Sequence, residues 1–202
     1  MTDLYSEAIK TREDHLYNVM SNDRFLQKQG LNNEIPFFIF PYNPKEQTDI
    51  EKMGKRLKTK LELKGVRILK INLYDLSIDL LKKAGIFEDI LSNEHDLLPS
   101  ELFEDLQGSL DPERHIVPEI GRRMKAQFYD ILWITGVGEV YPWLRSHTVL
   151  HNLQSVATEQ PTLLWFPGQY SFSQTGGSSL KLFNRLADSR YYRAFNILDY
   201  QI

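Results

Sequence analysis

The stretch that decides the fold runs Tyr129-Asp130-Ile131-Leu132-Trp133-Ile134-Thr135 and is followed by Gly136-Val137-Gly138. Its apolar residues follow one another without a polar interruption and include aromatic and β-branched types, which favours a buried strand over a helix. The glycines after Thr135 are typical of a turn at the end of such a strand. The stretch therefore predicts one strand of a sheet that helices cover on both faces.

Three further apolar runs accompany this strand, namely residues 36–41 (PFFIFP), 66–73 (VRILKINL) and 161–166 (PTLLWF). Residues 44–64 indicate a helix that ends at Gly65, so the first two runs are predicted to form a βαβ unit with parallel pairing and a right-handed crossover. Strands separated by helices predict an α/β fold, a Rossmann-like three-layer sandwich. With residues 191–198 as an edge strand, we expect a mostly parallel sheet of four to five strands.

The remaining segments complete this architecture, and the length of 202 residues predicts a single domain spanning residues 1–202. Apolar spacing at helical period predicts a helix over residues 4–20, within an N-terminal helical segment of residues 1–30. We also expect a helical insert over residues 76–127, a helix over 143–156, an exposed Gly/Ser-rich loop over 169–179 and a short helix over 180–186.

Composition excludes several classes of protein. The chain has no cysteine, which excludes disulfides, thiolate metal sites and a cysteine nucleophile. Residues 1–7 lack the pattern of a signal peptide and no apolar run reaches about 18 residues, so we expect a cytoplasmic protein without membrane contact. The net charge of −3 argues against non-specific binding of nucleic acid, although Lys and Arg gather on residues 52–60 and 122–125. These clusters are interpreted as solvated helix faces.

The carboxyl ends of the predicted strands form the candidate ligand site, because open α/β sheets bind ligands at that edge. Residues 41–44, 136–139 and 167–170 are expected to converge there. A glycine-rich turn such as Gly136-Val137-Gly138 can present backbone N–H groups to a phosphate, with Glu139 and Arg145 as further binding residues. The third glycine of a dinucleotide fingerprint would fall at Tyr141, so a purely structural turn is the alternative interpretation.

No complete catalytic motif is found. Gly176-Gly177-Ser178-Ser179 lacks the lysine of a phosphate-binding loop. His147 and His151 have the i, i+4 spacing of metal ligands on a helix, but no third ligand stands near them in the sequence. Ser146 adjoins His147 and neighbours along a helix do not face each other. We therefore expect no catalytic residue, no metal and no cofactor.

Aromatic and arginine side chains gather in the last third of the chain. Tyr and Arg are the residue types that dominate the energetics of protein–protein interfaces. They can also stack on single-stranded nucleic acid, but the negative net charge favours a protein partner. The predicted partner-binding residues are Tyr170, Arg185, Tyr191, Tyr192 and Arg193.

Read as whole phrases, the chain resembles the BrxB family of bacteriophage-exclusion (BREX) systems. The resemblance rests on a central block at residues 133–148 (WITGVGEVYPWLRSHT), continued by 150–154 (LHNLQ). A second block, residues 164–170 (LWFPGQY), and the closing phrases at 182–186 and 191–195 add to it, and residues 37–42 (FFIFPY) match the family's start.

This resemblance implies a bacterial phage-defence protein that works beside the PglZ alkaline-phosphatase-like protein, with a methyltransferase and an AAA+ ATPase in the same system. Such systems methylate host DNA and block phage DNA replication. The family offers no agreed catalytic residues to transfer. The main hypothesis is thus a non-catalytic adaptor or scaffold that binds PglZ. The alternatives are a nucleotide- or phosphate-binding regulatory domain (a sensor or weak hydrolase) at the Gly136–Gly138 turn and, less favoured, a DNA-binding accessory protein.

Overall fold

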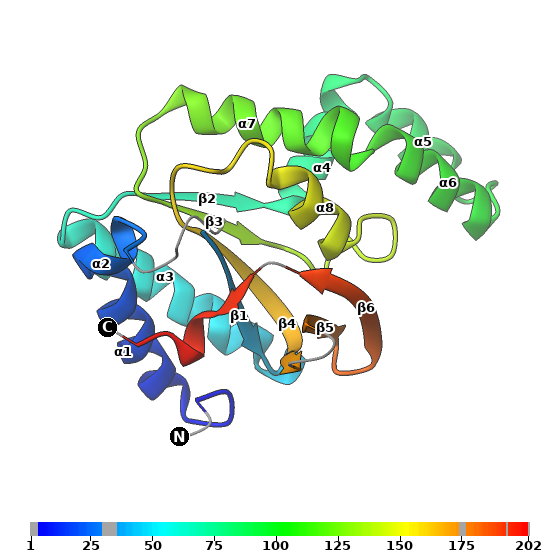
Figure 1. The fold of residues 1–202 in the computed structure, drawn as a ribbon. Coiled ribbons are helices and arrows are strands. Elements are labelled where there is room, and N and C mark those ends of the chain that lie inside the picture. Colours follow the sequence, from blue (N-terminus) through cyan, green and yellow to red (C-terminus); the bar gives the residue numbers. More distant parts are fainter. Residues whose placement is uncertain (1–3, 30–35, 174–176, 193, 202) are drawn as a thin grey trace.

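The computed structural model describes residues 4–29, 36–173, 177–192 and 194–201, and at residues 172–173, 177–178 and 188–192 it describes the backbone alone. Helices lie on both faces of a mostly parallel sheet, which confirms the predicted Rossmann-like α/β fold (Figure 1). In the described part of the chain, no helix has the length and apolar character needed to cross a membrane.

The parallel part of the sheet has the strand order β2-β3-β4-β1-β7. Its strands are β1 (Phe37–Tyr42), β2 (Ile68–Asn72), β3 (Ile131–Thr135), β4 (Thr162–Ser173) and β7 (Phe195–Asn196). The prediction that β1 and β2 pair directly was wrong, because β1 pairs with β4 and β7 while β2 pairs with β3. All six residues of β1 are buried, as in the middle of a sheet, whereas β2 exposes Lys70 and lies at the edge.

Side chains point alternately to the two faces of the sheet, so the buried ones form two separate cores. Trp133 and Trp165 face one core, which is closed by α1 (Ile9–Met20), α2 (Asp23–Leu26) and α3 (Gln47–Leu63); the short helix η1 (Pro44–Glu46) precedes α3 and has no buried residue. Leu132 and Leu164 face the other core, which is closed by α4 (Leu73–Lys83), α7 (Val117–Ala126) and α8 (Ser146–Leu153). Since successive side chains of a strand point to opposite faces, neighbouring residues serve different layers of the sandwich.

The helices between β2 and β3 match the predicted insert in type, with shifted bounds. They are α4, α5 (Phe87–Asn93), α6 (Pro99–Ser109), the π-helical turn η2 (Pro112–Ile116) and α7. The first of them begins at Leu73, directly after β2, because the Asn72 side chain caps α4 by accepting hydrogen bonds from the N–H groups of Tyr74 and Asp75. Helices α5 and α6 contain no buried residue and extend away from the sheet (Figure 1).

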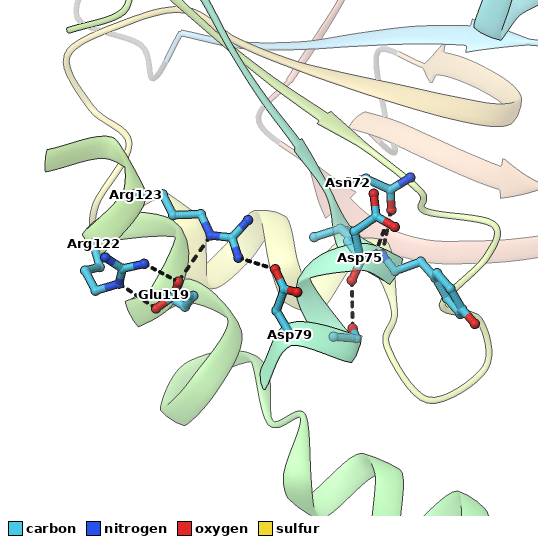
Figure 2. A network of polar contacts seen from close by, with 9 residues as sticks. Asn72, Asp75, Asp79, Glu119, Arg122 and Arg123 are labelled. Carbon is cyan, nitrogen blue, oxygen red and sulfur yellow. Dashed lines mark hydrogen bonds and ion pairs between the residues drawn. The ribbon is translucent and has the colours of Figure 1, made fainter. Parts of the chain in front are cut away.

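A polar network fastens α7 to α4. Arg123 donates to Asp79 across the two helices at 2.8 Å, and both Arg122 and Arg123 donate to Glu119 (Figure 2). The hydrogen bond from Arg122, aided by Arg123 and opposed by burial, lowers the pKa of Glu119 to about 2. The carboxylate is thus ionised in the folded protein well below neutral pH.

The C-terminal part departs most from the predictions. Strand β4 does not end at Pro167-Gly168 but continues into an antiparallel ribbon with β5 (Gly177–Leu182) and β6 (Leu186–Tyr192), which brings the sheet to seven strands in the described chain. The predicted loop over 169–179 is therefore largely strand, apart from 174–176, which lie outside the described residues. The helix predicted at 180–186 is wrong, because β5 ends there in a turn with positive φ at Phe183 and Asn184.

Pro167 and Gly168 are both unusual within a strand, and β4 accommodates each of them for a different reason. Pro167 is the last residue in register with β1, at the point where the parallel ladder ends. A Cβ on Gly168 would lie 2.2 Å from the carbonyl oxygen of Lys181 on β5, so the ribbon can form only with glycine at this position. The pair that indicates a turn in the sequence thus marks the change of pairing partner.

Three helix and strand bounds also differ. The N-terminal helix begins at Ile9 rather than residue 4, and the helix after β3 covers only Ser146–Leu153 of the predicted 143–156. The predicted last strand, residues 191–198, contains the end of β6, the edge strand β7 and the 3-10 turn η3 (Ile197–Asp199).

Candidate functional site

The three segments expected at the carboxyl edge of the sheet do converge. They enclose a cavity of about 400 Å³ that is lined by Tyr42 and Pro44 from the first, by Gly136, Val137, Gly138 and Glu139 from the second, and by Pro167 from the third. Gln47 and Glu51 of α3 and Phe183 of the ribbon turn complete the lining. Residues far apart in the sequence thus meet where an open α/β sheet binds ligands.

Gly136 has a structural reason to be glycine. Its φ is +81°, and a Cβ there would lie 2.3 Å from Oδ1 of Asn72, the atom that caps α4. The chain after β3 therefore lies close against the start of α4. A larger residue would disturb the cap and the turn together.

The Gly136-Val137-Gly138 turn does not lead directly into a helix. The N–H groups of Glu139 and Val140 both donate to the carbonyl oxygen of Gly136, and the next helix, α8, begins only at Ser146. Phosphate-binding turns owe their strength to a helix N-terminus that follows at once. The geometry agrees better with the structural interpretation of this turn than with a phosphate cradle.

Glu139 gives the edge cavity an acidic character. Its Oε2 lies 3.4 Å from Nδ2 of Asn72, and Glu51 lines the same cavity. Burial foremost, and then the charges of Glu139 and Glu51, raise the pKa of Tyr42, whose hydroxyl donates to Gln47 at 2.6 Å. The phenol is therefore neutral at physiological pH, and the two carboxylates remain available to groups that carry a proton or a positive charge.

A second cavity, of about 260 Å³, lies between α3 and the sheet and shares Tyr42, Gln47, Glu51, Gly136 and Glu139 with the first. Its other lining residues include Lys55 and Lys58 of α3, Lys70 and Asn72 of β2, Trp133 and Thr135 of β3, and Trp165 of β4. Lys55 and Lys58 belong to the basic cluster at residues 52–60, which the sequence indicated only as a solvated helix face. The sequence alone did not bring them together with β2 and β3, because the pairing of these strands joins segments about 60 residues apart.

The other predicted site residues do not gather at this edge. Arg145 is exposed at the N-terminus of α8 and lines neither cavity. Tyr170 is half-buried against the core and its hydroxyl donates to the carbonyl oxygen of Ala194. Arg185 is exposed in the turn between β5 and β6. The side chains of Tyr191 and Tyr192, and all of Arg193, lie outside the described residues.

The two histidines lie on α8 as predicted, with His147 buried and His151 exposed. Among the residues that the structure describes, no group of three His, Asp or Glu side chains is placed to hold a metal ion.

A strongly acidic surface was missed in the sequence because the net charge averages over the whole chain. Between Lys83 and Arg114 there is neither Lys nor Arg. The same segment has nine carboxylates, and all but Asp111 are exposed: Glu88, Asp89, Glu94, Asp96, Glu101, Glu104, Asp105, Asp111 and Glu113. Leu91 and Leu98 are also exposed, at 48% and 63%. We call helices α5 and α6, with the segment that joins them, the acidic arm.

Comparison with known proteins agrees with the resemblance noted in the sequence. Residues 69–197 match the family model described as "BREX protein BrxB". A BREX protein BrxB of Bacillus cereus (strain H3081.97) is 31% identical over 199 residues, which cover 95% of this chain and 98% of the relative. One from Escherichia coli O9:H4 (strain HS) is 29% identical over 191 residues, 95% of this chain and 92% of the relative. No solved structure is significantly similar. The chain therefore belongs to the BrxB family and is a component of a BREX system.

Proposed function

We propose that this chain is a non-catalytic adaptor that binds the PglZ-type protein of its BREX system and so supports host DNA methylation and phage restriction. The observation that carries the proposal is the acidic arm. It stands away from the sheet, it concentrates negative charge, and it exposes Leu91 and Leu98 where no part of the described chain covers them.

An arm of this kind is suited to docking. Its carboxylates would steer a partner with a basic surface toward it and raise the association rate, while the exposed leucines would supply apolar area once the two surfaces meet. Phe87, Ile90 and Leu106 pack against the core and attach the two helices to the body, but neither helix has a fully buried residue. Contact with a partner would therefore bury further apolar surface of the arm.

The antiparallel ribbon is proposed as a second contact surface. Arg185 is exposed in the turn before β6, whereas Tyr191 and Tyr192 lie at the opposite end of that strand, followed in the sequence by Arg193, so this surface would extend along the ribbon. Tyr170 is assigned instead to holding the ribbon, since its hydroxyl already donates to Ala194. The methyltransferase and the AAA+ ATPase of the system are proposed as further partners in the same assembly.

The test is a binding measurement between the purified chain and the PglZ-type protein of the same system. Glu101→Gln, Glu104→Gln and Asp105→Asn together remove three exposed charges from α6 and are expected to weaken binding at least tenfold. A matched control, Asp14→Asn, Asp49→Asn and Glu62→Gln, removes three exposed carboxylates from α1 and α3 and should leave affinity within twofold.

Two outcomes would count against this function. Absence of binding at micromolar concentrations would refute the adaptor. Binding that is insensitive to the α6 changes but lost on Arg185→Ala and Tyr191→Ala would move the interface from the acidic arm to the ribbon. Direct DNA contact, the weaker alternative, is tested by a salt-dependent gel shift, for which the acidic arm predicts no complex.

A further inference from the structure

The cavity between α3 and the sheet has an ordered arrangement of chemistry. Strand register sets two rows across its floor: Lys70 of β2 lies beside Trp133 of β3, and Asn72 lies beside Thr135. Trp165 of β4 continues the second row. Trp133 pairs with Leu163, so two residues further along both strands Thr135 lies beside Trp165. Helix α3 leaves the carboxyl edge and returns toward the start of β2, so it runs antiparallel to these strands above the floor.

The floor carries buried hydrogen-bond donors without acceptors. Nε1 of Trp133, Nε1 of Trp165 and Oγ1 of Thr135 are all buried and have no hydrogen-bond partner among the described residues. Trp133 is 1% exposed and Trp165 is 5% exposed. Buried polar groups are paired in the large majority of proteins, so these three groups on the floor lack a partner that a bound molecule could supply. Nε1 of Trp143, which lines neither cavity, is buried and unpaired in the same way, so a ligand is inferred from the charged groups around the cavity as well.

The end of the cavity that lies deeper along α3 is basic. Lys55 and Lys58 are separated by one helical turn and line the same cavity as Lys70. Lys70 precedes Asn72 on β2, so it lies further from the carboxyl edge of the sheet. Lys58 also pairs with Glu62. Lys55 and Lys70 make no ion pair within the described chain, so their ammonium groups are available to an anion.

The end of the second cavity that lies near the carboxyl edge of the sheet is acidic instead of basic. Glu51 and Glu139 offer carboxylate oxygens there. The amides of Gln47 and Asn72 are already engaged, with Tyr42 and Glu51 and with the cap of α4, so they hold the two carboxylates in place. These groups suit a ligand that presents N–H donors at the end remote from its negative charge.

We propose that this cavity binds a nucleoside 5′-monophosphate. The phosphate would lie against Lys55 and Lys70, the base would contact the indoles of Trp133 and Trp165 and accept hydrogen bonds from the floor, and its N–H groups would donate to Glu51 or Glu139. A volume of about 260 Å³ is close to the lower limit of ligand pockets, roughly 300 Å³, which favours a mononucleotide over a dinucleotide. The proposal is independent of the adaptor function, because it concerns this chain alone.

Titration followed by ¹⁵N NMR of the indole N–H groups tests it directly. The chain has three tryptophans, and Trp143 lines neither cavity, so it serves as an internal control. Addition of AMP, GMP, CMP or UMP is expected to shift the Trp133 and Trp165 signals in a saturable manner and to leave Trp143 nearly unchanged. Assignment uses Trp143→Phe, which leaves the cavity intact.

Affinity measurements on variants complete the test. Lys55→Ala with Lys70→Ala is expected to weaken binding of the preferred mononucleotide at least tenfold, since both changes are on the surface and remove a charge that faces the phosphate. Lys64→Ala with Lys125→Ala removes two exposed lysines elsewhere and should have no effect. The proposal is overturned if no mononucleotide binds saturably up to millimolar concentrations, if only Trp143 responds, or if inorganic phosphate binds as tightly as every mononucleotide.

Discussion

Gly136 lies at a point of the sheet edge that has no room for a side chain. Gly136→Ala would place a methyl group 2.3 Å from Oδ1 of Asn72 at a φ of +81°, so both the turn and the cap of α4 must be disturbed. We expect a loss of about 2–4 kcal/mol in the free energy of unfolding, measured by urea denaturation. The control is Gly108→Ala on α6, where a Cβ meets nothing within 4 Å and stability should rise slightly. Equal stability of the Gly136→Ala variant and the wild type would contradict this account.

Glu119 makes a prediction about acid stability. Its pKa, lowered first by the hydrogen bond from Arg122, is about 2 in the folded protein, below the ordinary value of 4.5. The ionised form is thus favoured by folding, and its contribution is fully present above about pH 4.5 and is lost as the pH falls toward 2. Glu119→Gln should lower the free energy of unfolding by about 1–3 kcal/mol at pH 7.

Denaturant unfolding at several pH values is the measurement. The difference in free energy of unfolding between Glu119→Gln and wild type should shrink below pH 4.5, while the exposed Glu104→Gln should show little effect at any pH. A difference that does not vary with pH would count against the ion-pair account.

Among the elements, α1 is held to α3 by charges that are removed from solvent. Glu13 is 1% exposed and accepts hydrogen bonds from Arg56 and Lys60 of α3. Burial would raise the pKa of Glu13, but these two bonds outweigh it and the pKa is lowered. Arg12, fully buried, donates to Glu46 at the start of α3.

The contrast between adjacent residues of α1 tests this attachment. Glu13→Ala removes the buried carboxylate that Arg56 and Lys60 share. Because the side chains of Arg56 and Lys60 are 52% and 42% exposed and can be hydrated when left alone, the expected loss of stability is about 1–2 kcal/mol. Asp14→Ala removes an exposed pair with Lys10 on the same helix and should cost less than about 1 kcal/mol. Both values come from thermal or urea unfolding, and similar effects of the two changes would show that α1 is not held in this way.

Prediction from the sequence succeeded where a local rule determines structure. The apolar runs identified β1, β2 and β3, and the rule that ligand sites lie at the carboxyl ends of parallel strands brought Tyr42, Gly136 and Pro167 together correctly. It failed at Pro167-Gly168, because a proline followed by glycine is also compatible with a strand that exchanges one neighbour for another. No local pattern could reveal that exchange, since it depends on β5 pairing with β4 and bringing the carbonyl oxygen of Lys181 close to Gly168.

The candidate sites were predictable only in part for a similar reason. The glycine turn stood out in the sequence, whereas the lysines and indoles of the second cavity become neighbours only through the strand order β2-β3-β4. The acidic arm is different, because its seven carboxylates are visible in the sequence once charge is counted by segment rather than over the whole chain. Whether such a run stands free of the body depends on packing, which the sequence does not determine.

For the whole molecule, the uneven distribution of charge predicts how association responds to salt. If the acidic arm steers the PglZ-type protein, the association rate constant should fall at least severalfold between 50 and 300 mM NaCl, because the Debye length shortens from about 14 to 6 Å. The dissociation rate should change much less. Rapid-mixing measurements with wild type and with the α6 charge variant separate the two, and a variant that keeps the full salt dependence would assign the steering to another surface.

In the part of the chain that the structure describes, strand β4 belongs to both the parallel sheet and the antiparallel ribbon. Its residue Pro167 lines the edge cavity, and the residues from Gly168 onward pair with β5. Because the two parts of β4 are continuous, a displacement of the ribbon by a docked protein would also move Pro167. The opening of the edge cavity would change with it. Since such coupling is reciprocal, a molecule bound in the edge cavity would change the affinity of the ribbon for its partner by the same factor.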